Sequence, residues 1–178
     1  LSEPAVAVAN QAKSAGVPII SFSKRDSFPT GGGVFRLGLT SKSQTRELTD
    51  VVVRKLGLGR FGVVAADDAL GQELATNFKN DLKRLGIAPV FDLSYRKGNA
   101  DAFSALANEL QSFDVQAIFF PDSIENASRF FSTLGSEGKP KVVPLGPATW
   151  ADGVQLKNSQ AALDGAVFVA PFFEQTPR

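Results

Sequence analysis

Short apolar runs alternate with segments of helical periodicity along most of this chain, and no other feature constrains its fold as strongly. The runs predict strands at residues 17–20, 34–37, 61–65, 88–93, 117–120, 142–145 and 166–170. Strands that alternate with helices are typical of βαβ units and a parallel sheet. The sequence therefore predicts an α/β fold with a doubly wound parallel sheet, in a Rossmann-like arrangement of three αβα layers.

Between the predicted strands, apolar residues recur every three or four positions, which places one apolar stripe of each helix against a sheet. The predicted stripes are Ala5, Val8, Ala12 and Ala15; Leu48, Val52 and Leu56; Leu70, Leu74, Phe78 and Leu82; Phe103, Leu106, Leu110 and Phe113; and Ile124, Ala127, Phe131 and Leu134.

The segment 23–33 interrupts this rhythm, because Pro29 and three successive glycines, 31–33, stand between two strands. We expect a lobe boundary there. Residues 34–164 then form a nearly complete doubly wound lobe, whereas residues 1–33 supply one helix and one strand, which need a larger sheet to cover. Since the chain begins Leu-Ser-Glu-Pro without Met or a signal peptide, we interpret it as a fragment of a longer protein.

Composition removes several kinds of chemistry. The 178 residues include no Cys, His or Met, which excludes disulfides, thiolate nucleophiles, zinc sites built on Cys or His, and histidine bases. A net charge of +1 argues against a nucleic-acid partner. The longest apolar stretch, 166–173, is too short to span a membrane. We expect no enzyme, no catalytic residue, no metal and no cofactor.

Ligands of open parallel sheets bind outside the carboxyl ends of the strands. The loops at 67–71, 121–126 and 146–150 follow predicted strands and are expected to line one edge of the sheet, and residues 21–25 follow the first strand. The candidate ligand contacts in these places are Ser21, Ser23, Lys24, Arg25, Asp68, Leu70, Asp122, Ser123, Ala148 and Trp150.

Helix capping is the simpler interpretation of several of these residues. Asp122 with Glu125, and Ser41 with Gln44, have the spacing of a capping box. Capping would engage these side chains in satisfying the free backbone N–H groups of a helix start, with or without a ligand.

The other candidates also have two interpretations. The pair Asp67 and Asp68 either begins a helix or forms a carboxylate pair for acid–base work or Mg²⁺. Lys24 and Arg25 either face solvent or hold an anionic ligand. Trp150 either stacks on a ligand or covers the edge of the sheet.

Glycine-rich segments do not indicate a nucleotide site. Residues 57–62 spell G-x-G-x-x-G, but a predicted helix precedes them and a strand follows, which reverses the order of the dinucleotide fingerprint. We predict that Gly57 ends the helix before it. The triplet 31–33 lacks the Gly-Lys-Ser/Thr ending of a phosphate loop and is interpreted as a flexible turn.

An ordered set of segments resembles a known family. The segments are Gly-Val-Pro-Ile-Ile-Ser at 16–21, Val-Phe-Arg at 34–36, Phe-Gly-Val-Val at 61–64, Asp-Asp-Ala-Leu-Gly-Gln-Glu-Leu-Ala at 67–75, Ala-Ile-Phe-Phe-Pro-Asp-Ser at 117–123 and Asp-Gly-Ala-Val-Phe-Val at 164–169. Together they resemble the type I periplasmic binding proteins of the leucine/isoleucine/valine-binding family. The segments 119–123 and 165–169 are most similar to the branch of penicillin-binding protein activators that includes LpoA-like lipoproteins.

The resemblance implies two α/β lobes that close on a ligand like a hinge. Residues 1–33 would complete the first lobe, 34–164 would form the second, and 165–178 would cross back to the first. It also implies a bacterial periplasmic location, with a lipid anchor in the full-length protein. The partners would be a small ligand, such as an amino acid, a peptide or a cell-wall fragment, an envelope protein such as a transporter permease or a cell-wall synthase, or both.

Three positions depart from the amino-acid binders of this family. Where those proteins usually have two aromatic walls and an acid for the ligand ammonium, this sequence has Leu70, Ser123 and Ala148. Lys24 and Arg25 favour an anionic ligand. We therefore expect a ligand-binding or sensing domain of a cell-envelope lipoprotein, with the substrate-binding component of an ABC transporter, for amino acids or other small polar or anionic ligands, as the alternative.

Overall fold

The computed structural model describes residues 2–99, 102–136 and 142–171. By its internal contacts the chain divides into two compact units, Leu1–Ser43 and Gln44–Arg178. Each unit is described by itself below.

The first unit contains one helix, α1 (Ser2–Ala15), and two short parallel strands, β1 (Ile19–Ser21) and β2 (Val34–Arg36). Its small core consists of buried Ala9, Phe28 and Val34, with Ala5, Val6 and Ile19 packed against them. The predicted stripe of α1 was therefore partly wrong, since Val8 is 57% exposed and Ala9 is buried. The helix is turned so that positions 5, 6 and 9 face the strands.

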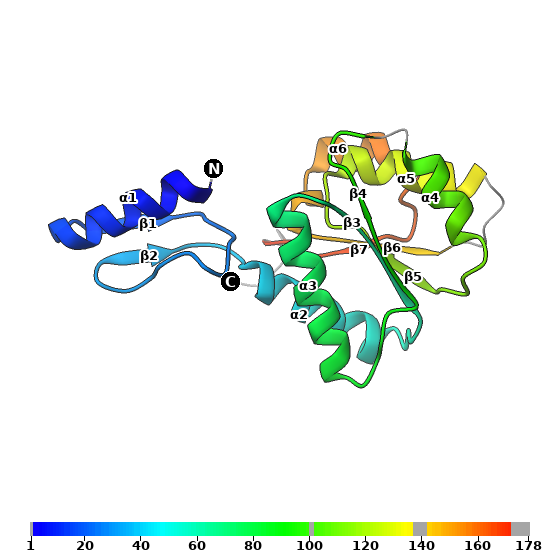
Figure 1. The fold of residues 1–178 in the computed structure, drawn as a ribbon, viewed down its shortest axis with the longest axis horizontal. Coiled ribbons are helices and arrows are strands. Elements are labelled where there is room, and N and C mark those ends of the chain that lie inside the picture. The colour runs from blue at the N-terminus through cyan, green and yellow to red at the C-terminus, as the bar shows by residue number, and fades with distance from the viewer. Residues whose placement is uncertain (1, 100–101, 137–141, 172–178) are drawn as a thin grey trace. The chain divides into compact units, whose positions relative to one another are not determined.

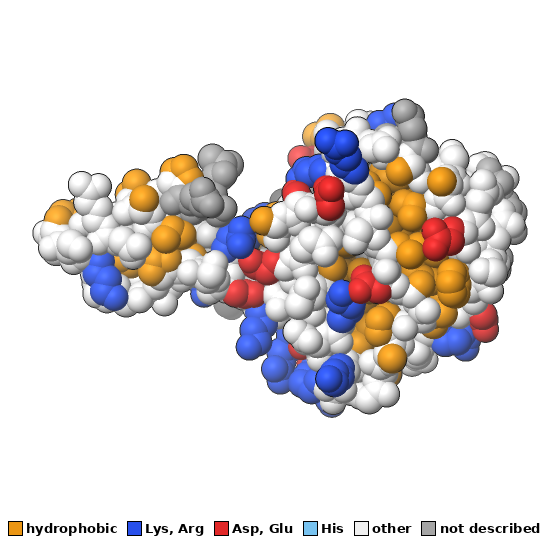
Figure 2. All heavy atoms as spheres, in the orientation of Figure 1, with side chains coloured by type: hydrophobic (Ala, Val, Ile, Leu, Met, Phe, Trp, Pro, Cys, Tyr) orange, Lys and Arg blue, Asp and Glu red, His pale blue; other side chains and the backbone are white. Residues whose placement is uncertain are grey.

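One face of this two-stranded sheet is apolar and uncovered. Ile20 lies opposite Phe35, and their side chains are 61% and 59% exposed. Phe22 and Leu37, which follow the two strands, are also exposed, and Figure 2 shows hydrophobic side chains over the surface of this unit. A sheet of two strands is marginal alone.

The division between the units falls inside a helix. Helix α2 (Ser41–Asp50) begins in the first unit, continues in the second, and runs on into one π-helical turn, Val51–Lys55. The division lies later than the boundary expected within 23–33 because β2 pairs with β1 and so remains with the first unit. Gly57 has a φ of 68° and follows the end of this helix, as predicted.

The second unit is a five-stranded, all-parallel sheet with helices on both faces (Figure 1). Its spatial strand order is β4-β3-β5-β6-β7. Along the chain the elements are β3 (Phe61–Ala66), α3 (Ala69–Arg84), β4 (Phe91–Tyr95), α4 (Ala102–Leu110), β5 (Ala117–Phe119), α5 (Ile124–Ser136), β6 (Val143–Gly146), the 3₁₀ turn η2 (Ala148–Trp150), α6 (Gly153–Ser159) and β7 (Val167–Phe168). The predicted fold class is confirmed.

Aromatic side chains fill the space on both sides of this sheet. Phe78 of α3 stacks on Phe119 at 4.4 Å between ring centroids. Because successive residues of a strand point to opposite faces, Phe120 points the other way, where it stacks on Phe130 of α5 at 5.0 Å. All five strands predicted for this unit are present.

Two details of the second unit differ from prediction. Strand β4 begins at Phe91 rather than 88, because Pro89 has no N–H and the first hydrogen bond toward β3 comes from Val90 N, at 2.7 Å to Phe61 O. Helix α6 has no strong apolar stripe; it begins because the carboxylate of Asp152 accepts from the N–H groups of Val154 and Gln155. Of the expected crossing segment 165–178, residues 172–178 lie outside the described residues.

Candidate functional site

The strand order of the second unit creates a point where the chain reverses direction across the sheet. From β3 the chain passes to β4 on one side and then returns to β5 on the other, so the carboxyl ends of β3 and β5 flank the crevice in which such sheets bind ligands. A pocket of about 200 Å³ lies there. It is lined by Asp68, Leu70, Gly71, Leu74, Lys97, Pro121, Asp122, Ser123, Pro147 and Thr149.

Four of the predicted contacts, Asp68, Leu70, Asp122 and Ser123, line this pocket. Ala148 does not, although both of its chain neighbours do. The strand-end rule therefore brings together loops that are far apart in the sequence, as expected.

Asp68 caps the start of α3 and lines the pocket at once. Its side chain accepts from Gly71 N at 2.7 Å and from the Lys97 ammonium. Burial opposes ionisation of this carboxyl, but the hydrogen bonds from Lys97 and Gly71 outweigh it and lower the pKa of Asp68. A Cβ at Gly71 would lie 2.8 Å from both Ala66 O and Asp68 Oδ1, so the cap requires glycine there.

Lys97 is a pocket residue that sequence reasoning missed. Its ammonium pairs with Asp68, and its backbone N–H donates to Asp67 Oδ1 at 2.8 Å. The hydrogen bond with Asp68 is the main reason why the pKa of Lys97 is raised. The carboxylates of Asp67 and Asp68 thus bind the backbone and Lys97, and the described residues contain no group of three or more acidic, Cys or His side chains able to hold a metal.

Asp122 is held by three neutral donors. Its Oδ1 accepts from Ser123 N at 2.7 Å, and its Oδ2 accepts from Asn126 Nδ2 at 2.9 Å and from the hydroxyl of Tyr95. The predicted capping box with Glu125 was wrong in detail. Ser123 is the residue that caps α5, because its Oγ accepts from Asn126 N at 3.3 Å.

The hydroxyl of Tyr95 donates a hydrogen bond to the Asp122 carboxylate. The ring is 4% exposed and stacks on Phe120 at 5.6 Å. Burial, and then the hydrogen bond to Asp122, raise the pKa of Tyr95, so its hydroxyl stays protonated and remains a donor.

Trp150 follows the pocket residue Thr149 but does not itself line the pocket. It is fully buried, and its Nε1 donates to the carbonyl oxygen of Asp122 at 2.9 Å. Its ring covers Gly146, where a Cβ would come within 2.1 Å of the indole. Of its two interpretations, this conformation therefore corresponds to covering the sheet edge, and Trp150 ends the turn η2 instead of starting a helix.

Ala148 is fixed by a residue more than a hundred positions earlier. Its backbone N–H donates to Gln44 Oε1 at 2.9 Å. The predicted capping box of Ser41 with Gln44 lacks the half in which Gln44 Oε1 accepts from Ser41 N, because Ser41 N donates to Lys24 O at 2.8 Å. Thr40 Oγ1 accepts from Ser43 N at 3.1 Å, and the Ser41 hydroxyl donates to Lys24 O at 3.1 Å.

Ser21, the first of the candidates in the first unit, ends β1, and the other three follow it. Ser21 Oγ accepts from Ser23 N at 3.1 Å, and the carbonyl oxygen of Arg25 accepts from Arg36 Nη1 at 2.8 Å. These bonds shape a turn in which Lys24 is exposed and Arg25 is half-buried. Both basic side chains thus reach the surface of this unit.

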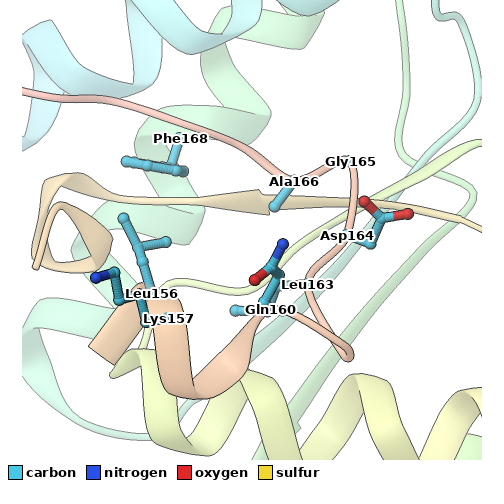
Figure 3. A pocket seen from close by; sticks show the side chains of 8 residues that line it. All are labelled: Leu156, Lys157, Gln160, Leu163, Asp164, Gly165, Ala166 and Phe168. Carbon is cyan, nitrogen blue, oxygen red and sulfur yellow. The ribbon is translucent and has the colours of Figure 1, made fainter. Parts of the chain in front are cut away.

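A second, wider hollow of about 330 Å³ lies between α6 and β7. Figure 3 shows Leu156 and Phe168 lining it together, with Lys157, Gln160 and Asp164 also around it. None of the predicted contacts lies there. It is shallow and is lined by α6, β7 and the segment between them, away from the crevice between β3 and β5, so we take the smaller pocket as the candidate site.

Comparison with known proteins places this geometry in context. A family model described as periplasmic binding protein matches residues 1–178. No curated protein sequence matches the chain.

No helix among the described residues has the length and apolar character needed to cross a membrane.

Solved structures share the fold at low sequence identity. A leucine-binding protein from Thermotoga maritima matches with a TM-score of 0.77 and 20% identity over 93% of this chain and 47% of its own. A branched-chain amino acid substrate-binding protein from Streptococcus pneumoniae, solved with isoleucine, gives 0.70 and 22% over 88% and 44%. A solute-binding protein from R. palustris, solved with benzoate, gives 0.73 and 22% over 90% and 44%. The chain thus spans less than half the length of each.

Proposed function

Because the chain belongs to the periplasmic binding protein family, we propose that it is part of a solute receptor that binds a small ligand and delivers it to an ABC transporter. Membership of this family implies a periplasmic location and a protein that binds a ligand without catalysing a reaction. The similar structures include a branched-chain amino acid substrate-binding protein solved with isoleucine and a solute-binding protein solved with benzoate, which supports this class of ligand.

One observation carries the proposal. The pocket of the second unit collects side chains that follow four strands, β3, β4, β5 and β6, at the chain reversal of the sheet. Acidic and basic side chains lie there beside leucine and proline side chains, and a few polar groups in an apolar lining are usual for a small-molecule site. Ser21, which ends β1, and Ser23, Lys24 and Arg25, which follow it, are proposed as ligand contacts of the first unit, taken by itself.

The role of a lipoprotein that activates a cell-wall synthase draws no support from these matches, and neither does a lipid anchor. The transporter role is therefore the one we put to the test. A pull-down of a synthase by the purified protein, without any small-molecule binding, would reverse this choice.

The test is a ligand screen on the complete chain by thermal shift and calorimetry, with the twenty amino acids, benzoate and 4-hydroxybenzoate as probes. We expect at least one probe to raise the melting temperature. Thr149→Trp places an indole in the pocket and should abolish that shift, whereas Ser132→Trp, at an exposed site on α5, should keep it. Binding that survives Thr149→Trp would place the ligand elsewhere and refute the proposal.

A further inference from the structure

We propose, resting on the function above, that Gln44 is a positioning residue of the ligand pocket. Its side-chain carbonyl holds the backbone of Ala148, and Ala148 stands between Pro147 and Thr149, which both line the pocket. Gln44 itself is not among the residues that line the pocket. It therefore acts on a ligand through the loop that follows β6.

The loop after β6 contains a backbone N–H that its own turn cannot satisfy. Ala148 is the first residue of the 3₁₀ turn η2, and the N–H groups at the start of a helical turn have no carbonyl partner within it. The residue before the turn is Pro147, whose side chain makes no capping hydrogen bond. Gln44 Oε1 takes the place of this cap, at 2.9 Å from Ala148 N.

The bond reaches the loop from a helix that is itself fixed within the second unit. Gln44 is 3% exposed, so its side chain has little freedom to move. The next residue of α2, Thr45, donates from its hydroxyl to Asp81 Oδ2 of α3 at 2.8 Å, and both residues are buried. Further along α2, Asp50 pairs with Arg84 of α3 at 2.9 Å. These two bonds anchor α2 to α3, and Gln44 extends the anchor to the loop after β6.

The packing around Gln44 shares two residues with the pocket. Gln44 and Leu48 lie with Leu74, Phe119 and Pro147 around a space that is too small for a water molecule. Leu74 and Pro147 also line the pocket. Because closely packed side chains transmit a displacement to their neighbours, a change at Gln44 affects the pocket wall by contact as well as through the hydrogen bond.

Loss of the Gln44 acceptor should release this loop. Without it, the N–H of Ala148 turns toward water, and Pro147 and Thr149 lose their fixed positions on the pocket wall. Binding must then also order the loop, and the entropy lost in that step weakens the affinity. In the unmodified chain, Gln44 orders the loop before a ligand arrives.

Two substitutions separate the acceptor from the volume of the side chain. Gln44→Met keeps the length of the side chain and removes the acceptor, whereas Gln44→Glu keeps an oxygen that accepts in either protonation state. We expect Gln44→Met to weaken binding by at least about fivefold, which corresponds to about 1 kcal/mol, and Gln44→Glu to stay within about threefold of the unmodified chain. Gln160→Met, the same exchange at an exposed position outside this pocket, should leave the affinity unchanged.

Calorimetry on the complete chain measures the affinity. The probes are isoleucine and benzoate, together with any other compound of the screen above that raises the melting temperature. Amide hydrogen exchange of Ala148, followed by NMR without a probe, measures the bond itself, and it should be at least about tenfold faster in Gln44→Met than in the unmodified chain or in Gln44→Glu. If Gln44→Met does not fold, Gln44→Asn replaces it, because its amide is one methylene shorter and does not reach Ala148.

Three outcomes would overturn the inference: an unchanged affinity in Gln44→Met, an equal loss of affinity in Gln44→Met and Gln44→Glu, or an exchange rate of Ala148 N–H that Gln44→Met does not alter. If Thr149→Trp still abolishes binding in any of these cases, the receptor function stands and only the role of Gln44 is refuted. If no probe binds the unmodified chain, the receptor function fails and the role of Gln44 fails with it.

Discussion

The indole of Trp150 donates a hydrogen bond to the carbonyl oxygen of Asp122 at 2.9 Å, although the two residues follow different strands. The bond joins the loop after β5 to the turn after β6. Because Trp150 is fully buried, it fixes the backbone from which the Asp122 carboxylate projects into the pocket.

Removing the indole donor should cost stability and binding together. In Trp150→Phe the Asp122 carbonyl loses its partner in a buried place, and the smaller ring leaves a space, which together predict a loss of about 2–4 kcal/mol. Urea unfolding followed by circular dichroism measures the change. A loss below about 0.5 kcal/mol would show that the bond does not support the loop.

Glycine 146 should tolerate no side chain. A Cβ there would lie 2.1 Å from the Trp150 ring, so Gly146→Ala is expected to destabilise the protein by about 1–3 kcal/mol. Gly135→Ala is the matched control, since it lies in α5 with no atom within 4 Å of the added carbon, and it should be neutral or stabilising by up to about 1 kcal/mol. Equal effects of the two substitutions would contradict the packing of Trp150.

The ion pair of Lys97 with Asp68 should contribute to stability only within a window of pH. The pKa of Asp68 is lowered from 3.8 by folding, so its contribution is present above that value and is lost as pH falls through the folded pKa. The pKa of Lys97 is raised above 10.5, so its contribution is lost as pH rises through the folded pKa.

The stability difference between the unmodified chain and Lys97→Met should therefore be constant at neutral pH and shrink below about pH 3.8 and above about pH 10.5. Since Lys97 is half exposed, the difference should stay below about 1 kcal/mol. Denaturant titrations across pH measure it. A difference that does not change between pH 7 and pH 3 would show that the pair adds nothing.

The apolar strand face of the first unit should be covered in the complete protein. Phe35 is 59% exposed here, so Phe35→Asn would cost little if the face stayed open. If further strands of the same lobe cover it, we expect a loss above about 1 kcal/mol in the complete chain. Val154→Asn, at a residue that is 70% exposed on α6, is the control and should remain within about 0.5 kcal/mol.

Periodicity was sufficient to predict the sheet and most helices, because strands buried on both faces and amphipathic helices leave opposite patterns in a sequence. It was insufficient for α1, where five of the first nine residues are Ala or Val and several stripes fit equally well. It also placed β4 too early. The loop after β4 was then not considered, and Lys97 was missed for that reason.

The sequence alone did not predict which side chains form hydrogen bonds with residues that are distant in the chain. Local spacing paired Ser41 with Gln44 and Asp122 with Glu125, whereas Gln44 bonds the distant Ala148. A capping box is a local sequence pattern. When a side chain instead bonds a residue that is distant in the sequence, the local spacing of residues stays the same and does not predict that bond.

The residues that line the pocket are of two kinds. Some are needed for the backbone conformation of the loops, and others only contribute side-chain volume. Gly71 admits no Cβ, whereas the side chains of Leu70 and Thr149 line the cavity and form no hydrogen bond or ion pair within the described part of the chain. Exchange at the latter two positions can change the shape of the cavity while the loops stay in place. A library of variants at Leu70 and Thr149 would therefore vary the shape of this pocket at little cost in folding yield, which makes the second unit a practical scaffold for engineered binding sites.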